Sequence, residues 1–257
     1  MGLMRQDRAQ RARAVVAAVL AAGMTAGCVP STAPGLDPLP QPAVPVTRPG
    51  VPPVLPPAQA AQNFVSVVQR VEPVAEAICR ERSRGRMNCD IEIVIDKRPN
   101  LPPNAFQTED NLGRPVVGFT LSLIADARNA DEIAFVLGHE AAHHISGHLP
   151  RQQQTATTGA LLGTLLGQAT GADPAALQQL QELGATVGAR RFSKEFELEA
   201  DALGAEIAFR AGYDPVRGAG FFARLPDPGD QFLGSHPPNA QRQAQVAAVV
   251  AQLRRSY

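Results

Sequence analysis

The segment 139–143 reads His-Glu-Ala-Ala-His and follows an apolar run, residues 133–138, that favours a helix. His139 and His143, four residues apart, would lie one turn above each other on that helix, separated by about 6 Å of axial rise. Their imidazoles can therefore converge on one Zn²⁺ ion, each at roughly 2.0–2.1 Å. Glu140 would lie beside the ion, where its carboxylate can accept a proton from the attacking water. A chance match on a surface helix is the alternative, because the pattern is short.

A catalytic zinc usually has three protein ligands and a water molecule, so a third ligand is needed. Glu197 and Asp201 lie four residues apart on a second predicted helix and share one of its faces. Glu197 can bind the ion, and Asp201 can accept the outer N–H of a ligating histidine, which fixes its tautomer. The alternative is a solvated acidic face, but we expect Glu195 and Glu199 to project elsewhere.

Four of the five histidines of the chain lie within ten residues, which is a concentration typical of metal chemistry. His144 lies one step round the helix from His143, and His148 is expected on the same face as His144. Neither is expected to be a ligand.

The 257 residues are 44% hydrophobic, which is enough for a buried core in one or two domains. The formal net charge is zero and tryptophan is absent, so nothing indicates a nucleic-acid-binding surface.

Residues 1–27 have the pattern of a signal peptide, with a basic start and an apolar stretch too short to span a bilayer. Small residues precede Cys28, as in the bacterial lipobox, so we expect Cys28 to be lipidated. Thr25 departs from that pattern, and ordinary secretory cleavage is the alternative. Residues 28–57 form a proline-rich linker, and residues 58–257 form the folded domain.

Cys79 and Cys89 remain as one pair if Cys28 carries lipid. Export to an oxidising compartment would allow them to form a disulfide that closes a short polar loop. Two free buried thiols are the alternative.

Periodicity and breaker residues predict the elements that must position these side chains. The motif helix should begin at a cap on Asn129 or Asp131 and run to about Leu149, before Pro150. The other predicted helices cover residues 63–82, 121–127, 174–189, 192–211, 215–225 and 238–253, and the predicted strands cover residues 90–96, 104–107 and 115–120.

Residues 155–172 are uncharged, and glycine recurs every fourth position from Gly159 to Gly171. On a helix such a row allows close approach of another helix or of a membrane surface. A mobile or internally packed segment beside the site is the interpretation we favour.

The order of these motifs resembles a gluzincin family of zinc metallopeptidases. That family includes HtpX, the CaaX prenyl protease, the Oma-type protease and the beta-barrel-assembly-enhancing protease. Beyond His-Glu-x-x-His, the resemblance rests on the segment 193–201, on Asn-Ala-Phe at 104–106, on the run 131–138, on Ala-Gly-Tyr-Asp-Pro at 211–215, and on Ser-His-Pro-Pro at 235–238 with Arg242. It spans about residues 60–255. Lys194, where arginine is usual, and His144, where an aliphatic residue is usual, depart from the pattern.

The resemblance implies an α+β, zincin-like fold, in which a mostly helical domain carries a small sheet beside the motif helix. It implies Zn²⁺ bound by His139, His143 and Glu197, with Glu140 as the general base. His236 would lie near the metal, either as a fourth ligand that silences the enzyme or as a catalytic aid to the oxyanion. The substrate would lie along a strand edge, at residues 104–107 or 116–120.

The function expected on this basis is a zinc endopeptidase of the bacterial envelope that degrades misfolded or stalled envelope and outer-membrane proteins. It would lie in the periplasm, lipid-anchored to the outer membrane. The outer-membrane assembly machinery is an expected partner. A non-proteolytic chaperone or scaffold with a structural zinc is the alternative, against which Glu140 argues. A zinc-dependent peptidoglycan amidase or endopeptidase is the third hypothesis, against which the Glu197–Asp201 spacing argues.

Overall fold

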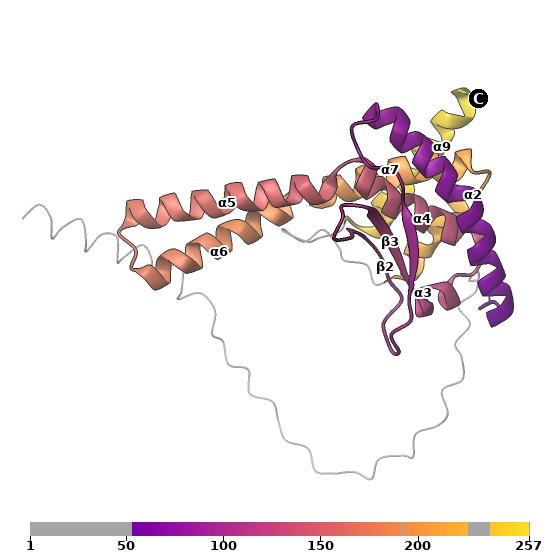
Figure 1. The fold of residues 1–257 in the computed structure, drawn as a ribbon, viewed down its shortest axis with the longest axis horizontal. Coiled ribbons are helices and arrows are strands. Elements are labelled where there is room, and N and C mark those ends of the chain that lie inside the picture. Colours follow the sequence, from indigo (N-terminus) through magenta and orange to yellow (C-terminus); the bar gives the residue numbers. More distant parts are fainter. Residues whose placement is uncertain (1–52, 192, 226–236, 257) are drawn as a thin grey trace, which may run out of the picture. The chain divides into compact units, whose positions relative to one another are not determined.

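The computed structural model describes residues 53–191, 193–225 and 237–256. Cys28 and His236 therefore lie outside the described residues. In chain order the elements are α2 (Pro57–Ser83), β1 (Glu92–Asp96), β2 (Ala105–Glu109), β3 (Pro115–Thr120), α3 (Leu121–Asp126), α4 (Ala130–Ile145), α5 (His148–Thr170), α6 (Pro174–Arg191), α7 (Ser193–Arg210), α8 (Pro215–Gly218), the 3₁₀ helix η1 (Ala219–Arg224) and α9 (Asn239–Ser256) (Figure 1).

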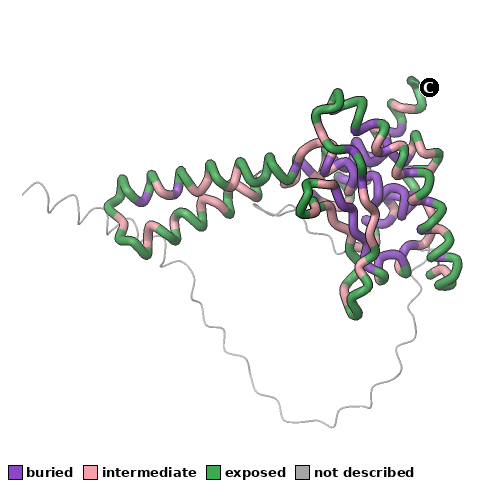
Figure 2. The backbone as a smooth tube through the Cα atoms, in the orientation of Figure 1, coloured by how far each residue is buried: buried purple, intermediate pink, exposed green. Residues whose placement is uncertain are grey.

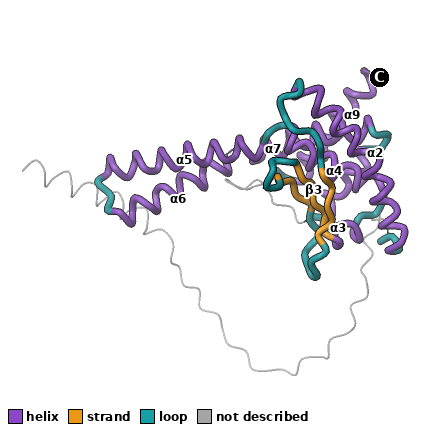
Figure 3. Tube along the Cα trace, in the orientation of Figure 1, coloured by secondary structure: helices purple, strands orange, loops and turns teal. Residues whose placement is uncertain are grey.

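The three strands form one sheet in the order β1-β3-β2, which lies beside α4 (Figure 3). β3 pairs with β1 in parallel and with β2 in antiparallel register, and every residue of β3 is buried. A central strand has no unpaired edge, so of the two substrate-binding edges expected from the sequence only the one on β2 is available.

The core lies where α2, α4 and α7 pack against one another and against the sheet (Figure 2). Apolar residues of α2 recur at helical spacing and three of them, Val67, Val71 and Ile78, are fully buried. Phe64 of the same helix meets Phe119 of β3 edge to face, with ring centroids 5.2 Å apart. The predicted mostly helical α+β fold is confirmed.

Helix α4 is capped by Asn129, whose side chain accepts a hydrogen bond from the backbone N–H of Glu132 at 3.1 Å. It ends at Ile145, so the prediction that it reaches about Leu149 is wrong. Gly147 adopts a left-handed conformation with φ of 64°, which breaks the helix, and α5 starts at the next residue. Pro150 lies in the first turn of α5, where proline has no hydrogen bond to break, so it marks a helix start.

The glycine-rich segment forms most of α5, which runs alongside α6 as a helical hairpin (Figure 1). A Cβ atom on Gly159 would lie 2.0 Å from the carbonyl oxygen of Gly184, and one on Gly188 would lie 2.1 Å from that of Thr155. Only glycine permits this backbone contact, so the row of glycines serves internal packing within the chain.

The helix predicted over residues 215–225 is divided into the short α8 and η1. Gly218 and Gly220, which favour helix poorly, lie at this division. Within the described residues we find no helix whose length and apolar character would let it cross a membrane.

Candidate metal centre

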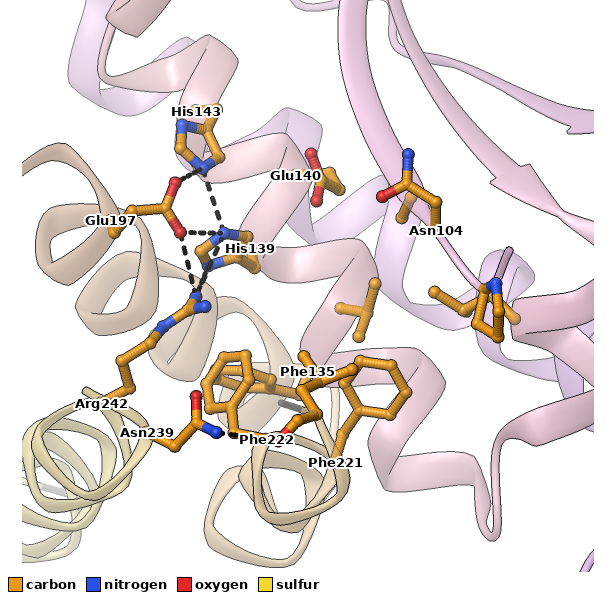
Figure 4. Close-up of a pocket in the computed structure, with 15 residues that line it drawn as sticks. Asn104, Phe135, His139, Glu140, His143, Glu197, Phe221, Phe222, Asn239 and Arg242 are labelled. Carbon is orange, nitrogen blue, oxygen red and sulfur yellow. Dashed lines mark hydrogen bonds and ion pairs between the residues drawn. The ribbon is translucent and has the colours of Figure 1, made fainter. Parts of the chain in front are cut away.

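Three side chains from α4 and α7 converge at one point of the domain (Figure 4). The Nε2 atoms of His139 and His143 lie 3.0 Å apart. Carboxylate oxygens of Glu197 lie 3.6 Å from the first of these nitrogens and 3.4 Å from the second. One ligand atom from each side chain falls within 4.8 Å of the others, so two nitrogens and one oxygen face a common centre.

Close packing of α4 on α7 brings these groups together. A Cβ atom on Gly204 would lie 2.7 Å from the backbone nitrogen of His139, and one on Gly138 would lie 2.7 Å from the carbonyl oxygen of Gly204. The two backbones touch here, which is possible only without side chains. Glu197 lies two turns earlier on α7 and thereby reaches the histidines.

The outer nitrogen of His139 is held by a buried ion pair. His139 Nδ1 lies 2.9 Å from Asp201 Oδ1, and Arg242 of α9 donates to both oxygens of that carboxylate at 2.7 and 2.8 Å. Burial by itself would raise the pKa of Asp201, but the hydrogen bonds from Arg242 and His139 outweigh it and lower that pKa. An ionised Asp201 is suited to accept the outer N–H of His139.

Arg242 contacts more groups of the site than the sequence indicated. In the sequence analysis it was named only as part of a late motif. Its Nη2 lies 3.3 Å from Glu197, and its guanidinium carbon lies 3.7 Å from the ring centroid of Phe222. Its contacts with the carboxylates and the stacked ring fix it in a buried position beside the centre.

The outer nitrogen of His143 faces a second histidine. His143 Nδ1 lies 2.8 Å from Nδ1 of His148, whose Nε2 lies 3.2 Å from Glu199. Glu199 lies outside the set of three converging side chains and reaches His143 only through His148. His148 belongs to α5 and does not share the face of His144, which is buried with its Nε2 2.7 Å from the carbonyl oxygen of Asn88. Burial lowers the pKa of His148 to about 4, helped by the charge of His143.

Glu140 lines a cavity of about 370 Å³ together with all three converging side chains. Asn104, just before β2, lies on one side of the cavity, and Phe221 and Phe222 lie on another (Figure 4). Burial raises the pKa of Glu140, although the positive charges of the two histidines would oppose this. A carboxyl group with a raised pKa is suited to accept and return a proton.

The donor set fits a zinc ion, for which two imidazoles and one carboxylate are a common catalytic set. Burial by itself would lower the pKa of His139, but the hydrogen bond to Asp201 and the charge of Glu197 raise it. Protons would therefore compete with a metal for Nε2 of His139, so metal binding should weaken as the pH falls.

The other predicted pair, Cys79 and Cys89, is joined by a disulfide with a Cα separation of 5.7 Å.

Comparisons with known proteins agree with this arrangement. Residues 63–250 match the model of peptidase family M48. The chain is 30% identical over 164 residues to the mitochondrial metalloendopeptidase OMA1 of Saccharomyces cerevisiae, a match that covers 59% of this chain and 44% of that protein. It is 32% identical over 124 residues to the Vibrio cholerae protein named "Putative beta-barrel assembly-enhancing protease", covering 45% of this chain and 25% of that protein.

This chain thus spans less than half the length of both relatives. The family match extends from α2 to α9 and includes every residue of the centre described above. The chain therefore belongs to peptidase family M48, and its resemblance to the zinc metallopeptidases is confirmed.

Proposed function

We propose that this protein is a zinc-dependent endopeptidase of the bacterial cell envelope. The observation that carries the proposal is the convergence of His139, His143 and Glu197 beside Glu140 in one cavity. Zinc held by these three ligands would supply a Lewis acid that polarises the scissile carbonyl. The chain's own residues would then orient the substrate and move its protons.

Glu140 is the proposed general base. Its carboxylate would take a proton from the attacking water and later deliver it to the leaving amine. The edge of β2 is the proposed substrate-binding strand, because Asn104 and Ala105 line the same cavity and Gln107 lines an adjoining one of about 210 Å³ with Glu140 and His143. Backbone pairing with this edge would bind an extended peptide with little dependence on sequence.

Misfolded or stalled envelope and outer-membrane proteins are the proposed substrates. The name of the Vibrio cholerae relative supports a place near outer-membrane assembly, and the pattern of residues 1–28 supports export with lipidation at Cys28. We further propose that His236 approaches the fourth zinc position in the resting enzyme. A scaffold with a structural zinc is less well supported, because such a site has no use for Glu140 in the cavity.

The activity is tested with the full-length chain and its Glu140→Gln variant, using casein and an unfolded outer-membrane protein as substrates. The variant should keep its zinc and lose nearly all cleavage, because an amide of similar shape cannot accept the proton. Zinc is measured in both proteins. Equal cleavage by the two proteins would remove Glu140 from the base role, and no cleavage by either would argue for the scaffold.

A further inference from the structure

His148, the first residue of α5, joins the candidate metal centre to a charged pair on the surface. Its Nδ1 lies 2.8 Å from Nδ1 of His143, and its Nε2 lies 3.2 Å from Glu199. Arg151, one turn further along α5, donates to the same carboxylate oxygen at 2.8 Å. The contacts form one line from Arg151 through Glu199 and His148 to the imidazole of His143.

The hydrogen positions along this line follow from the orientation of His143. Its Nε2 faces His139 and Glu197, so this nitrogen is the ligand atom. A neutral imidazole that binds metal through Nε2 carries its proton on Nδ1, which must then donate. Nδ1 of His148 accepts this hydrogen bond. The proton of the neutral His148 ring therefore lies on Nε2, which donates to Glu199. Every donor on this path thus has an acceptor.

Packing against α7 fixes the ring of His148 in the orientation in which Nδ1 faces His143. It is 4% exposed and stacks on Phe196 of α7, with ring centroids 4.6 Å apart and planes 9° from parallel. On one continuous helix His148 would be turned by about 140° from His143 and could not face it. The left-handed conformation of Gly147 separates α5 from α4 and so allows one imidazole to face the other.

The two metal-facing histidines are thereby supported by two carboxylates of α7. His139 donates to Asp201 directly, whereas His143 reaches Glu199 only through a second imidazole. We propose that His148 is a positioning residue, which fixes the tautomer and ring orientation of His143 and relays the negative charge of Glu199 to it. This inference rests on the proposed zinc site and adds a residue that is not itself a ligand.

The main test compares His148→Phe with His148→Asn in the full-length chain. Phenylalanine keeps the stacking on Phe196 but accepts no hydrogen bond, whereas the side-chain oxygen of asparagine occupies nearly the place of Nδ1. We expect zinc affinity, measured by competition with a chelator, to fall about 10- to 100-fold in His148→Phe and to be largely restored in His148→Asn. His144→Gln, which alters the adjacent buried histidine outside this line, serves as the control and should leave zinc affinity unchanged.

The tautomer provides a second measurement that does not depend on cleavage. In ¹⁵N-histidine NMR spectra of the wild type, His143 should show a slowly exchanging proton on Nδ1, and this signal should vanish in His148→Phe. Glu199→Ala, at a more exposed position, should show a smaller loss of zinc affinity and covers the case in which His148→Phe does not fold. Wild-type zinc affinity in either His148→Phe or Glu199→Ala would overturn the inference, as would equal losses in the phenylalanine and asparagine variants.

A protein that binds zinc, loses affinity on His148→Phe and cleaves nothing would refute the peptidase while leaving the positioning role intact. A protein that cleaves its substrates but keeps wild-type zinc affinity on His148→Phe would support the peptidase and refute the positioning role.

Discussion

His139 and His143 each turn one ring nitrogen toward Glu197 and the other toward a hydrogen-bond acceptor. The two acceptors differ. Asp201 is fully buried and paired with Arg242, whereas His148 is itself hydrogen-bonded to Glu199, which lies near the surface. At this scale, Asp201 and the proposed His148–Glu199 relay would each hold one imidazole with its outer nitrogen as the donor. Ligands arranged in advance lose less freedom on binding and hold the ion in one geometry.

Asp201→Asn tests the buried pair in the metal-free protein. Because the folded-state pKa of Asp201 is lowered, its contribution to stability is present above the unfolded pKa of about 3.9 and is lost as the pH falls through the folded value. We expect the variant to be about 3–5 kcal/mol less stable than wild type at pH 7, since Arg242 loses its partner.

That difference should shrink as the pH is lowered below about 4. Urea unfolding at a series of pH values measures it, and Glu195→Gln, exposed on the same helix, controls for the loss of one negative charge. A difference that stays constant from pH 7 to pH 3 would contradict the assignment.

His236→Ala tests the proposed role of the histidine outside the described residues. If His236 holds the fourth zinc position at rest, its removal should raise basal casein cleavage, and this is the outcome we expect. If it chiefly supports the oxyanion, its removal should lower kcat by about 10²- to 10³-fold. X-ray absorption of the zinc-loaded resting enzyme should show four protein ligands, and three ligands with unchanged cleavage would leave His236 with neither role.

At the scale of elements, close contact between backbones sets the geometry of the site. Gly204 of α7 packs on the first residues of the metal motif in α4, and the same device joins α5 to α6. The two contacts serve different ends. The first aligns the ligands, whereas the second builds a hairpin that leaves several leucines more than half exposed, namely Leu161, Leu162, Leu165, Leu166 and Leu183.

Gly204→Ala should disturb the centre without altering any ligand. The new Cβ atom would lie 2.7 Å from the backbone nitrogen of His139, so α7 must shift away from α4 and take Glu197 with it. We expect a loss of about 1–3 kcal/mol in the free energy of unfolding, together with weaker zinc binding. Chelator competition and denaturant unfolding measure the two effects.

Gly220→Ala is the matched control, because a Cβ atom there would meet nothing within 4 Å. It should leave both zinc affinity and stability near wild type. If Gly204→Ala behaves like this control, the close helix contact does not determine ligand geometry.

Local patterns predicted most of the helices and the four residues spaced by one helical turn, because such spacing places side chains on one face. They could not predict that Arg242, 41 residues further along the chain, donates hydrogen bonds to Asp201. They also misplaced His148, which was expected on the motif helix. Gly147 ends that helix by adopting a left-handed conformation, and the sequence before Pro150 does not show whether the proline follows a helix end or lies at a helix start. Both failures concern contacts made by the tertiary fold.

At the scale of the whole domain, the disulfide joins the end of α2 to a loop that contacts the helix of the metal motif. Cys79 lies near the end of α2, and Cys89 follows Asn88, whose carbonyl oxygen is 2.7 Å from Nε2 of His144. His144 is buried and adjoins His143 in α4. The loop closed by the disulfide therefore rests on the helix that carries two of the three proposed ligands.

Replacing both cysteines by serine should therefore reduce stability and affect the centre indirectly. Opening a loop of this length allows more conformations in the unfolded chain, and we expect a loss of about 2–3 kcal/mol in the free energy of unfolding. Release of Asn88 would also leave the buried Nε2 of His144 without its partner, which adds a cost of about 1–3 kcal/mol if no water replaces it. A reducing agent should destabilise the wild type to the same extent and leave the double variant unchanged. If reduction changes neither protein, or if mass measurement finds two free thiols in the exported chain, the disulfide does not stabilise the motif helix in the cell.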